Sequence, residues 1–426
     1  MADVLIVGAG PAGLAAAISC AENGLQVKIL DEFVKPGGRL LGQLHQEPDG
    51  KWWNGIEEAA KLHEKAISLG VAIELGASVY DVQQTEQGWK IYSTRGAYQV
   101  PFLLLATGAA ERPVPVPGWT LPGVMSIGAA QVMTNVHRVK VGKRGVIIGI
   151  NVLSAAIARE LGLAGIELAA MVLPGKNMLN EEAANPLEVM NSMVRVAHLA
   201  PSSLARLAGR MMKSAALRKI GVHLYPKYGI KIWGTPVHLR KSAVQIYGTS
   251  RVEGVRIATV TASGEVIPGT ETEVPADFVC IAGGLYPLVE LAAVAGCSFK
   301  RIPELGGYVP VHNRKMKTML KGLYVAGNIT GIENAKVAIA QGTVAGLSIS
   351  LDRMTGGSKL LGSSKLLAKL EQAVNHVQYV RENALIHFHP NVLEGRKKME
   401  ALWHEQINGQ KKSFRKVNEG SPDHEH

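Results

Sequence analysis

The feature that most constrains the fold is a strand, a glycine turn and a helix at the start of the chain. Residues 4–13 read VLIVGAGPAG, so a short apolar run leads into Gly8, Gly10 and Gly13 with the spacing G-x-G-x-x-G. A small-residue helix is predicted over 14–23 and a second strand over 27–30. Such a βαβ unit places the pyrophosphate of a dinucleotide at the helix N-terminus, where N–H groups and the helix dipole attract anions.

The end of the second predicted strand carries the acid that completes such a site. Asp31 and Glu32 follow the strand, about 20 residues after the glycine turn, where a carboxylate accepts hydrogen bonds from ribose hydroxyls. A glycine turn used only for packing does not explain this acid. The sequence therefore predicts a bound dinucleotide.

A second strand and turn, VIIGINVLS at residues 146–154, is degraded. Gly149 is retained, but Asn151 and Ser154 replace the other two glycines, and Val172 and Leu173 occupy the place of a discriminating acid or arginine. Ser154 is small enough to keep helix and strand packed. We therefore favour a domain retained as a scaffold or interface, with a remodelled site for NAD(P) or another adenine nucleotide as the alternative.

The order of predicted elements indicates an α/β protein with two Rossmann-like domains. The first domain comprises residues 1–112 and 277–351, and the NAD(P)-like domain at 113–276 interrupts it. Residues 352–426 form a helical C-terminal extension, with a polar end from about residue 410 that we expect to be disordered. Further strands are predicted over 102–105, 278–282 and 323–326, and helices over 54–69, 203–219 and 334–350.

Composition excludes several classes of protein. The 426 residues are 47% apolar and contain 3 cysteines, with no C-x-x-C pair and no Cys/His cluster, so we expect no disulfide framework, metal site or iron–sulfur ligand set in this chain. The first strand leaves no room for a secretory signal, and no apolar run approaches the roughly 20 residues that span a bilayer. We expect a cytoplasmic location.

The net charge of +11 is concentrated in one segment. Residues 189–252 contain no Asp or Glu and eleven cations, which suggests an anionic partner such as a phosphate-bearing ligand, an acidic subunit or a membrane surface. A solvated helical face explains the segment equally well. A membrane surface is the less favoured partner, and nucleic acid is not expected because aromatic residues are only 5% of the chain.

Several segments carry a resemblance to a known group of enzymes: VGAGPAGLAAA, DE…PGGR, LLLATGAAERP, PGWTLPGVMSIGAAQ and GLYVAGNITGIENAKVAIAQGTVAG. Over about residues 3–351 the chain resembles the two-dinucleotide-domain flavoproteins. Within them it is most similar to the α subunits of heteromeric amine and amino-acid oxidising enzymes, a group that includes hydrogen cyanide synthase, opine oxidases, hydroxyproline and proline dehydrogenases and sarcosine oxidase.

The resemblance implies FAD as the cofactor. The implied contacts are Gly8, Gly10, Pro11, Ala12 and Gly13 at the pyrophosphate, Asp31 or Glu32 at the adenosine ribose, Gly38, Arg39 and Gln43 toward the flavin, Ala106, Thr107 and Gly108 over the cofactor, and Val79, Gly327, Asn328 and Val337. Asn328 replaces the family's Asp, whose carboxylate takes a ribityl hydroxyl, and its amide oxygen can still accept that hydrogen bond. The helix that starts near Val337 is implied to direct its N-terminal dipole at the flavin.

Three functions follow as hypotheses. The leading one is an FAD-containing α subunit of a heteromeric dehydrogenase that acts on an amine, imino or amino acid. Its expected partner is a substrate-oxidising flavoprotein β subunit, with a small iron–sulfur subunit as a further candidate. No catalytic acid, base or nucleophile is visible in this chain, which suits that division of labour.

The alternatives are a stand-alone NAD(P)H-dependent FAD oxidoreductase that reduces a quinone, ferredoxin or dye, and a non-catalytic assembly subunit with structural FAD. Disulfide reductases are set aside because the chain lacks their cysteine pair.

Overall fold

The protein folds into two compact units that the chain visits in turn. The computed structural model describes residues 2–47, 49–195, 214–355, 363–385, 387–389 and 391–419. The first unit comprises Met1–Leu40, Glu57–Ala110 and Tyr286–His426, and the second comprises Leu41–Ile56 and Glu111–Leu285. The C-terminal extension thus groups with the first unit, and residues 41–56, which the sequence pattern assigns to the first domain, group with the second.

A five-stranded parallel sheet forms the centre of the first unit, in the order β22-β9-β1-β2-β5. Its strands are β1 (Val4–Val7), β2 (Val27–Asp31), β5 (Ala72–Leu75), β9 (Phe102–Leu105) and β22 (Leu323–Val325). Residues of β1, β9 and β22 are almost entirely buried, as the continuous apolar runs of a parallel sheet covered on both faces require. The turns that follow β1, β2, β9 and β22 therefore meet at one edge of this sheet.

Small residues bring two helices of the first unit into backbone contact. The helices are α1 (Pro11–Glu22) and α9 (Ala335–Thr355). A Cβ atom built on Gly342 would lie 2.1 Å from the Ala12 carbonyl oxygen, and one on Gly346 would lie 2.5 Å from the Ala16 oxygen. Glycine is therefore required at both positions of α9.

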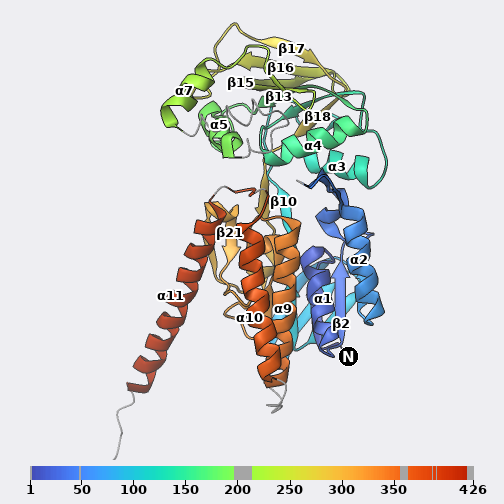
Figure 1. The fold of residues 1–426 in the computed structure, drawn as a ribbon, viewed down its shortest axis with the longest axis vertical. Helices are drawn as coiled ribbons and strands as arrows, with labels where there is room; N and C mark the ends of the chain where they lie inside the picture. Colours follow the sequence, from blue (N-terminus) through green and yellow to red (C-terminus); the bar gives the residue numbers. More distant parts are fainter. Residues whose placement is uncertain are drawn as a thin grey trace, which may run out of the picture. The chain divides into compact units, whose positions relative to one another are not determined.

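The remaining elements of the first unit surround this centre. They are α2 (Gly55–Ser68), α8 (Glu290–Val294), α10 (Ser363–Glu382), α11 (Val392–Glu419), the antiparallel sheet β6 (Val79–Thr85), β7 (Gly88–Ser93) and β8 (Gly96–Val100), the hairpin β20 (Phe299–Ile302) and β21 (Gly307–Pro310), and the 3-10 turns η3 (Pro303–Leu305) and η4 (Gly327–Thr330). Figure 1 shows α9 and α10 running side by side, and the buried Leu366, Leu370 and Val377 of α10 belong to the core cluster that contains α9.

The second unit is built on an eight-stranded mixed sheet in the order β11-β18-β12-β13-β15-β16-β17, with β14 paired to β15. Its strands are β11 (Val124–Ser126), β12 (Arg144–Ile148), β13 (Glu167–Leu173), β14 (Ile230–Ile232), β15 (Thr235–Tyr247), β16 (Gly254–Thr259), β17 (Thr272–Pro275) and β18 (Phe278–Ile281). The other elements are α3 (Ile127–Asn135), α4 (Val152–Leu163), α5 (Pro186–Arg195), α7 (Ala215–His223) and the hairpin β3 (Leu44–Gln46) and β4 (Trp52–Asn54). Three short elements contain residues of both units: the turn η1 (Gly38–Gly42) and the paired strands β10 (Ala109–Glu111) and β19 (Leu285–Pro287).

Two neighbouring residues of α4 attach the β3–β4 hairpin to the second unit. The buried Glu160 carboxylate accepts a hydrogen bond from the Leu44 N–H at 3.3 Å. The Arg159 guanidinium lies 5.5 Å from the ring centre of Trp52 and 5.4 Å from that of Trp233. These contacts explain why residues 41–56 leave the first unit.

The predicted α/β fold class is confirmed, and the predicted strands and helices agree closely with the observed ones. The helix expected over 203–219 lies largely outside the described residues, with α7 beginning at Ala215. α11 continues through Glu419, past residue 410, from which we expected a disordered end. Of the helices that the structure describes, none is sufficiently long and apolar to cross a membrane.

Candidate cofactor site

The first glycine turn uses its three glycines for three different purposes. Gly8 has a φ of +108°, and a Cβ atom there would lie 2.4 Å from the Ala106 carbonyl oxygen. A Cβ on Gly13 would lie 1.9 Å from the Gly8 oxygen. Around Gly10, in contrast, a Cβ would meet no protein atom within 4 Å. Gly8 and Gly13 are thus required by the protein itself, whereas Gly10 leaves open space beside the turn.

The helix that follows this turn begins without a side-chain cap. Gly10 is the N-cap residue of α1, it makes no side-chain hydrogen bond to the helix, and Pro11 occupies the first turn. The N–H groups of the first turn, which include those of Ala12 and Gly13, have no carbonyl partner within a helix. An anion in the space beside Gly10 would find these donors and the positive end of the helix dipole.

The structure separates the two candidate ribose ligands. Asp31 accepts hydrogen bonds from the Ala9 N–H at 2.5 Å and the Phe33 N–H at 2.7 Å. Burial raises the pKa of the Asp31 carboxyl, and the two backbone donors oppose that shift. Glu32 is exposed at the end of β2. Asp31 therefore stabilises the glycine turn, and Glu32 is the carboxylate presented to the surroundings.

The turn at residues 36–38 lies directly against the glycine turn. The Gly37 N–H donates to the Ala9 carbonyl at 2.7 Å, and a Cβ built on Gly38, which has a φ of +54°, would lie 3.2 Å from the Gly10 Cα. The next residue, Arg39, donates from Nε to the Ala109 carbonyl oxygen at 2.9 Å. Gly38 and Gly10 therefore border the same space.

Two further predicted segments follow the ends of β9 and β22. Thr107 donates from Oγ1 to the Leu288 carbonyl at 2.6 Å, and the Leu288 N–H donates to the Gly108 carbonyl at 3.1 Å. A Cβ on Gly327, which has a φ of +78°, would lie 2.8 Å from the Ala12 Cβ. Ala106 and Gly327 therefore reach the glycine turn itself, while Thr107 and Gly108 hold the segment at Leu288.

The side chain of Asn328 makes a hydrogen bond within the protein, in which its Oδ1 accepts from the Glu333 N–H at 3.2 Å. An amide oxygen has two lone pairs, so one acceptor site remains for a ribityl hydroxyl. At the start of α9, the Val337 N–H donates to the Asn334 side chain at 3.0 Å. The Val337 amide is thus used in a helix cap, and its side chain is 1% exposed.

Two further predicted residues, Val79 and Gln43, lie in segments outside the glycine turn and the strand ends described above. Val79 begins β6, and the Ala77 N–H just before it donates to the Asp31 carbonyl at 2.9 Å, so this segment adjoins the end of β2. Gln43 belongs to the second unit, where its carbonyl accepts from the Gly55 N–H at 2.9 Å. The structure brings the segment of Val79 near Asp31 and groups Gln43 with the second unit.

A buried polar network that the sequence does not predict supports the loop at Gly327 and Asn328. Gln341 of α9 accepts from the Gly327 N–H at 2.9 Å through Oε1 and donates to Glu333 at 3.3 Å through Nε2. Glu333 in turn pairs with Arg381 and Arg396, both at 2.5 Å. The network joins α10 and α11 to the loop that carries Asn328. No local pattern in the sequence indicates it, because the burial of Glu333 becomes visible only in the folded structure.

The second glycine turn has the same backbone contacts as the first, but side chains cap the N-terminus of the helix that follows it, α4. The Gly149 N–H donates to the Val172 carbonyl at 2.8 Å, and a Cβ on Gly149 would lie 2.2 Å from the Ala282 oxygen. Asn151 and Ser154 form a capping box, in which each side chain accepts from the backbone N–H of the other at 2.9 Å. The Asn151 amide also donates to the Ala282 carbonyl at 2.9 Å.

A dinucleotide would therefore meet a different surface at the second turn. The amide of Asn151 occupies the place where Gly10 leaves space, and a helix N–H group that would bind a pyrophosphate already has an acceptor. The Gly8 N–H donates to the Leu30 carbonyl at 2.8 Å, so Leu30 matches Val172 and Asp31 matches Leu173. Leu173 is fully buried, and Pro174, at the position that matches Glu32, has no side-chain acceptor to offer a ribose.

The cysteines do not supply a redox pair. Cys20 and Cys280 are free and fully buried in different units, and Cys297 is free and partly buried. Burial raises the pKa of all three thiols, to about 12 for Cys20 and Cys297. A thiol of this kind is a poor nucleophile.

The first turn fits the pyrophosphate of FAD. An uncapped helix N-terminus, the open space beside Gly10 and the exposed Glu32 at the end of β2 provide donors, room and a ribose acceptor at one sheet edge. The second turn offers none of these three features.

Comparisons with known proteins agree with this geometry. Residues 2–232 and 234–342 match the family of pyridine nucleotide-disulphide oxidoreductases. An opine oxidase subunit of Agrobacterium tumefaciens is 28% identical, and the aligned region covers 82% of this chain and 65% of that protein. The HcnB subunit of hydrogen cyanide synthase from Pseudomonas protegens is 27% identical, with 82% and 70% covered. This chain thus spans slightly less than two thirds of the opine oxidase protein.

Among solved structures, the L-proline dehydrogenase of P. horikoshii shares the fold. It has a TM-score of 0.59 and 18% sequence identity, with 87% of this chain and 58% of that chain covered. The family match extends over far more than half of the chain. The protein therefore belongs to the pyridine nucleotide-disulphide oxidoreductase family and is an FAD-dependent oxidoreductase.

Proposed function

We propose that this chain is the FAD-containing subunit of a heteromeric dehydrogenase or oxidase that oxidises an amine, imino or amino acid of the proline, hydroxyproline, sarcosine, glycine or opine class. Two of its relatives are named as subunits, of opine oxidase and of hydrogen cyanide synthase, and a structural relative is an L-proline dehydrogenase. A partner subunit carries the substrate-oxidising site, and a small iron–sulfur subunit is a further candidate partner.

The observation that carries the proposal is the difference between the two glycine turns. The turn at Gly10 is open and uncapped, whereas the turn at Asn151 is closed by its own side chains. A stand-alone NAD(P)H-dependent enzyme needs a nicotinamide nucleotide in its second domain. With that helix end occupied, the electrons come from a partner.

In this proposal the groups around the first glycine turn each contact a different part of FAD. The N–H groups of α1 bind the pyrophosphate across the space at Gly10, and Glu32 accepts from the adenosine ribose. The remaining lone pair of the Asn328 amide oxygen accepts a ribityl hydroxyl, and Gly38 and Arg39 border the cofactor from the adjacent turn. FAD, when bound, would supply reversible two-electron redox chemistry between the substrate-oxidising subunit and the final acceptor.

An anaerobic reduction experiment tests the proposal. The purified chain with FAD is mixed with NADH or NADPH, and the flavin absorbance near 450 nm is followed, in parallel with a preparation co-expressed with its genomic neighbours. We expect the nicotinamides to reduce the flavin slowly or not at all. The co-expressed complex is then supplied with proline, hydroxyproline, sarcosine, glycine and opines, one of which should reduce it.

Fast stoichiometric reduction of the isolated chain by NADH would contradict the division of labour. It would favour the stand-alone oxidoreductase that passes electrons to a quinone, ferredoxin or dye. A complex whose flavin no amino acid and no nicotinamide reduces would instead favour a subunit with structural FAD.

A further inference from the structure

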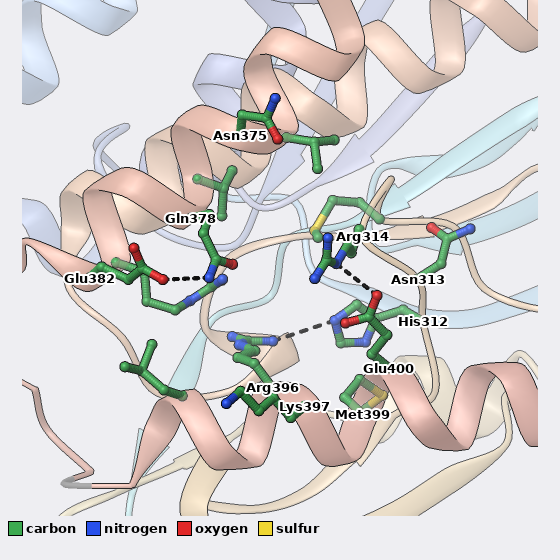
Figure 2. A pocket seen from close by; sticks show the side chains of 15 residues that line it. His312, Asn313, Arg314, Asn375, Gln378, Glu382, Arg396, Lys397, Met399 and Glu400 are labelled. Atoms are coloured by element: carbon green, nitrogen blue, oxygen red, sulfur yellow. Dashed lines mark hydrogen bonds and ion pairs between the residues drawn. The ribbon is translucent and has the colours of Figure 1, made fainter.

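The first unit contains a cavity of about 230 Å³ that the cofactor site does not use. It lies between α10, α11 and the loop at residues 312–316. Figure 2 shows Arg396 pointing from α11 toward His312, and Arg314 pointing from the loop toward Glu400. The cavity is smaller than the roughly 300–1,000 Å³ of sites for drug-sized ligands, which excludes a nucleotide or a flavin and leaves room for a small molecule.

Cations dominate the wall of this cavity. Four of its lining residues are cationic and two are acidic: Arg314, Arg381, Arg396 and Lys397 against Glu382 and Glu400. Both acids are engaged, because Glu400 accepts from the Arg314 Nε at 2.9 Å and Glu382 accepts from the Gln378 amide at 2.6 Å. These two contacts are drawn in Figure 2.

Two of the four cations are buried and share one carboxylate. The Arg381 and Arg396 side chains are 8% and 12% exposed, and each pairs with a different oxygen of Glu333 at 2.5 Å. One negative charge cannot neutralise two desolvated guanidinium groups, so a positive charge remains at the cavity wall. Arg396 also donates to the Thr330 carbonyl oxygen at 2.8 Å and to the Thr330 Oγ1 at 3.2 Å, which satisfies hydrogen bonds but adds no negative charge. A buried charge without a full counter-charge is costly.

Burial is the main influence on the protonation of His312 and Arg396. Burial, followed by the charge of Arg396, lowers the pKa of His312 to about 3. The imidazole is therefore neutral at neutral pH and adds no positive charge to the cavity wall. Burial also lowers the pKa of Arg396 to about 10, which leaves it protonated at neutral pH. In Figure 2 the Arg396 guanidinium and the His312 ring face each other, at 3.4 Å.

Hydrogen-bond donors remain available for a ligand. The described bonds of Arg381 to Glu333 use Nε and Nη2, and the bond of Arg314 to Glu400 uses Nε, so Nη groups of both arginines are left. Lys397 adds an exposed ammonium group at the rim. Planar guanidinium groups suit the two oxygens of a carboxylate.

We propose that this cavity binds a small organic carboxylate, which lies against Arg381 and Arg396 and is held at the rim by Arg314 and Lys397. The ligand would supply the missing counter-charge of the buried arginines. The site is separate from the glycine turn that holds the cofactor, and its occupancy does not depend on the proposed heteromeric function.

Isothermal titration of the full-length, FAD-loaded chain with succinate tests this proposal, in a Tris buffer free of other carboxylates. We expect saturable binding of one succinate per chain and a higher midpoint of thermal unfolding in its presence. Titrations with succinamide, which has the same shape without charge, and with inorganic phosphate serve as comparisons. Succinamide should not bind, and phosphate should bind more weakly than succinate.

Variants locate the binding. The double substitution Arg314→Gln with Lys397→Gln should weaken succinate binding about tenfold, because two charged donors are lost at the rim while the buried pair with Glu333 stays intact. Arg381→Lys keeps a charge beside Glu333 and should also weaken binding about tenfold through loss of the planar donor pair.

Lys398→Gln is the matched control on the same helix. Lys398 pairs with Glu304 and Glu394 and does not line the cavity, so this variant should bind succinate within about twofold of the native chain. Flavin absorbance and thermal unfolding without succinate are measured for every variant, to show that each is folded and retains FAD. No binding to the native chain, equal weakening by the control, or tighter binding of phosphate would overturn the proposal.

Discussion

The two glycine turns have nearly the same backbone and opposite surfaces. In each, the N–H of the first glycine donates to the neighbouring strand at 2.8 Å, and a Cβ on that glycine would collide with the carbonyl of an alanine, Ala106 or Ala282. The difference lies in three side chains, since Asn151, Ser154 and Leu173 replace Gly10, Gly13 and Asp31. A helix N-terminus therefore binds an anion only while its N–H groups lack an acceptor of their own, and the frame survives without that function.

The largest effect is expected from Gly10→Val. The new side chain meets no protein atom within 4 Å at Cβ, so the fold should be preserved, but it fills the space beside the pyrophosphate donors. We expect FAD affinity to fall at least about a hundredfold, as expected when two charge-assisted hydrogen bonds are lost. Flavin absorbance per chain after gel filtration measures the effect, and circular dichroism checks the fold.

Asn151→Val at the equivalent position of the second turn is the control for this variant. It should leave the flavin content unchanged. A Gly10→Val protein with a normal content of FAD would mean that the cofactor is held elsewhere, and the comparison of the two turns would lose its basis.

The next effect concerns the helices that follow the turns. Glu160 is the ninth residue of α4, where α1 has Ser19, and it is buried against donors from Gln131, Asn135 and Leu44. Burial raises the pKa of the Glu160 carboxyl to about 7, although these donors oppose the shift. In the unfolded chain a glutamate has a pKa of about 4.3.

Between these two pH values the folded chain holds a proton that the unfolded chain has lost. The free energy of unfolding should therefore decrease by about 3 kcal/mol as the pH rises from about 4 to about 7, and this contribution stays absent above that range. Urea unfolding across this range measures the change. Glu160→Gln, which keeps a neutral group in place, should flatten the curve, and an identical pH dependence in the variant would refute the assignment to Glu160.

The two acids of the first turn should separate in their effects. Glu32→Gln should weaken FAD binding about tenfold, because a charged acceptor for the ribose hydroxyls becomes neutral, with little change in stability. Asp31→Asn should instead lower stability, since Asp31 accepts from the Ala9 and Phe33 N–H groups. Fluorescence titration with FAD and urea unfolding distinguish the two outcomes. If Asp31→Asn alone lost the cofactor and left stability unchanged, the assignment of Glu32 to the ribose would be wrong.

The smallest effect is expected from Asn151→Ala. Loss of this helix cap should lower the free energy of unfolding by about 1 kcal/mol, the usual contribution of an N-cap side chain. NADH affinity should stay undetectable in this variant, because Pro174, at the position that matches Glu32, still offers no side-chain acceptor to a ribose. Measurable binding of NADH would show that the capping box alone closes the second turn.

The sequence predicted the parts of this molecule that depend on local patterns. Apolar runs that end in glycine identify β1, β9 and β22, and small residues identify the close packing of α9. The sequence marks Asn151 as an obstacle to a pyrophosphate, and the structure adds that it is also a helix cap. An Asn followed three residues later by Ser is itself a local pattern from which this role could have been predicted.

The remainder depends on contacts between distant residues. Glu333 pairs with Arg381 and Arg396, which lie 48 and 63 positions further along the chain. Glu160 contacts Leu44 across 116 positions. Each of these side chains lies on a helix or loop whose sequence resembles an ordinary polar surface, and only the tertiary packing buries it.

The contact between α1 and α9 has a mechanical consequence. Gly342 and Gly346 bring the two helix backbones into contact. At these positions no side chains lie between the helices, so none can rearrange there to let one helix shift against the other. The loop before α1 and the loop before α9 should therefore move as a single body, with a fixed spacing between the proposed places for the pyrophosphate and for the ribityl chain. Adaptation to a new substrate or partner must occur elsewhere, because this spacing is set by the length of the cofactor itself.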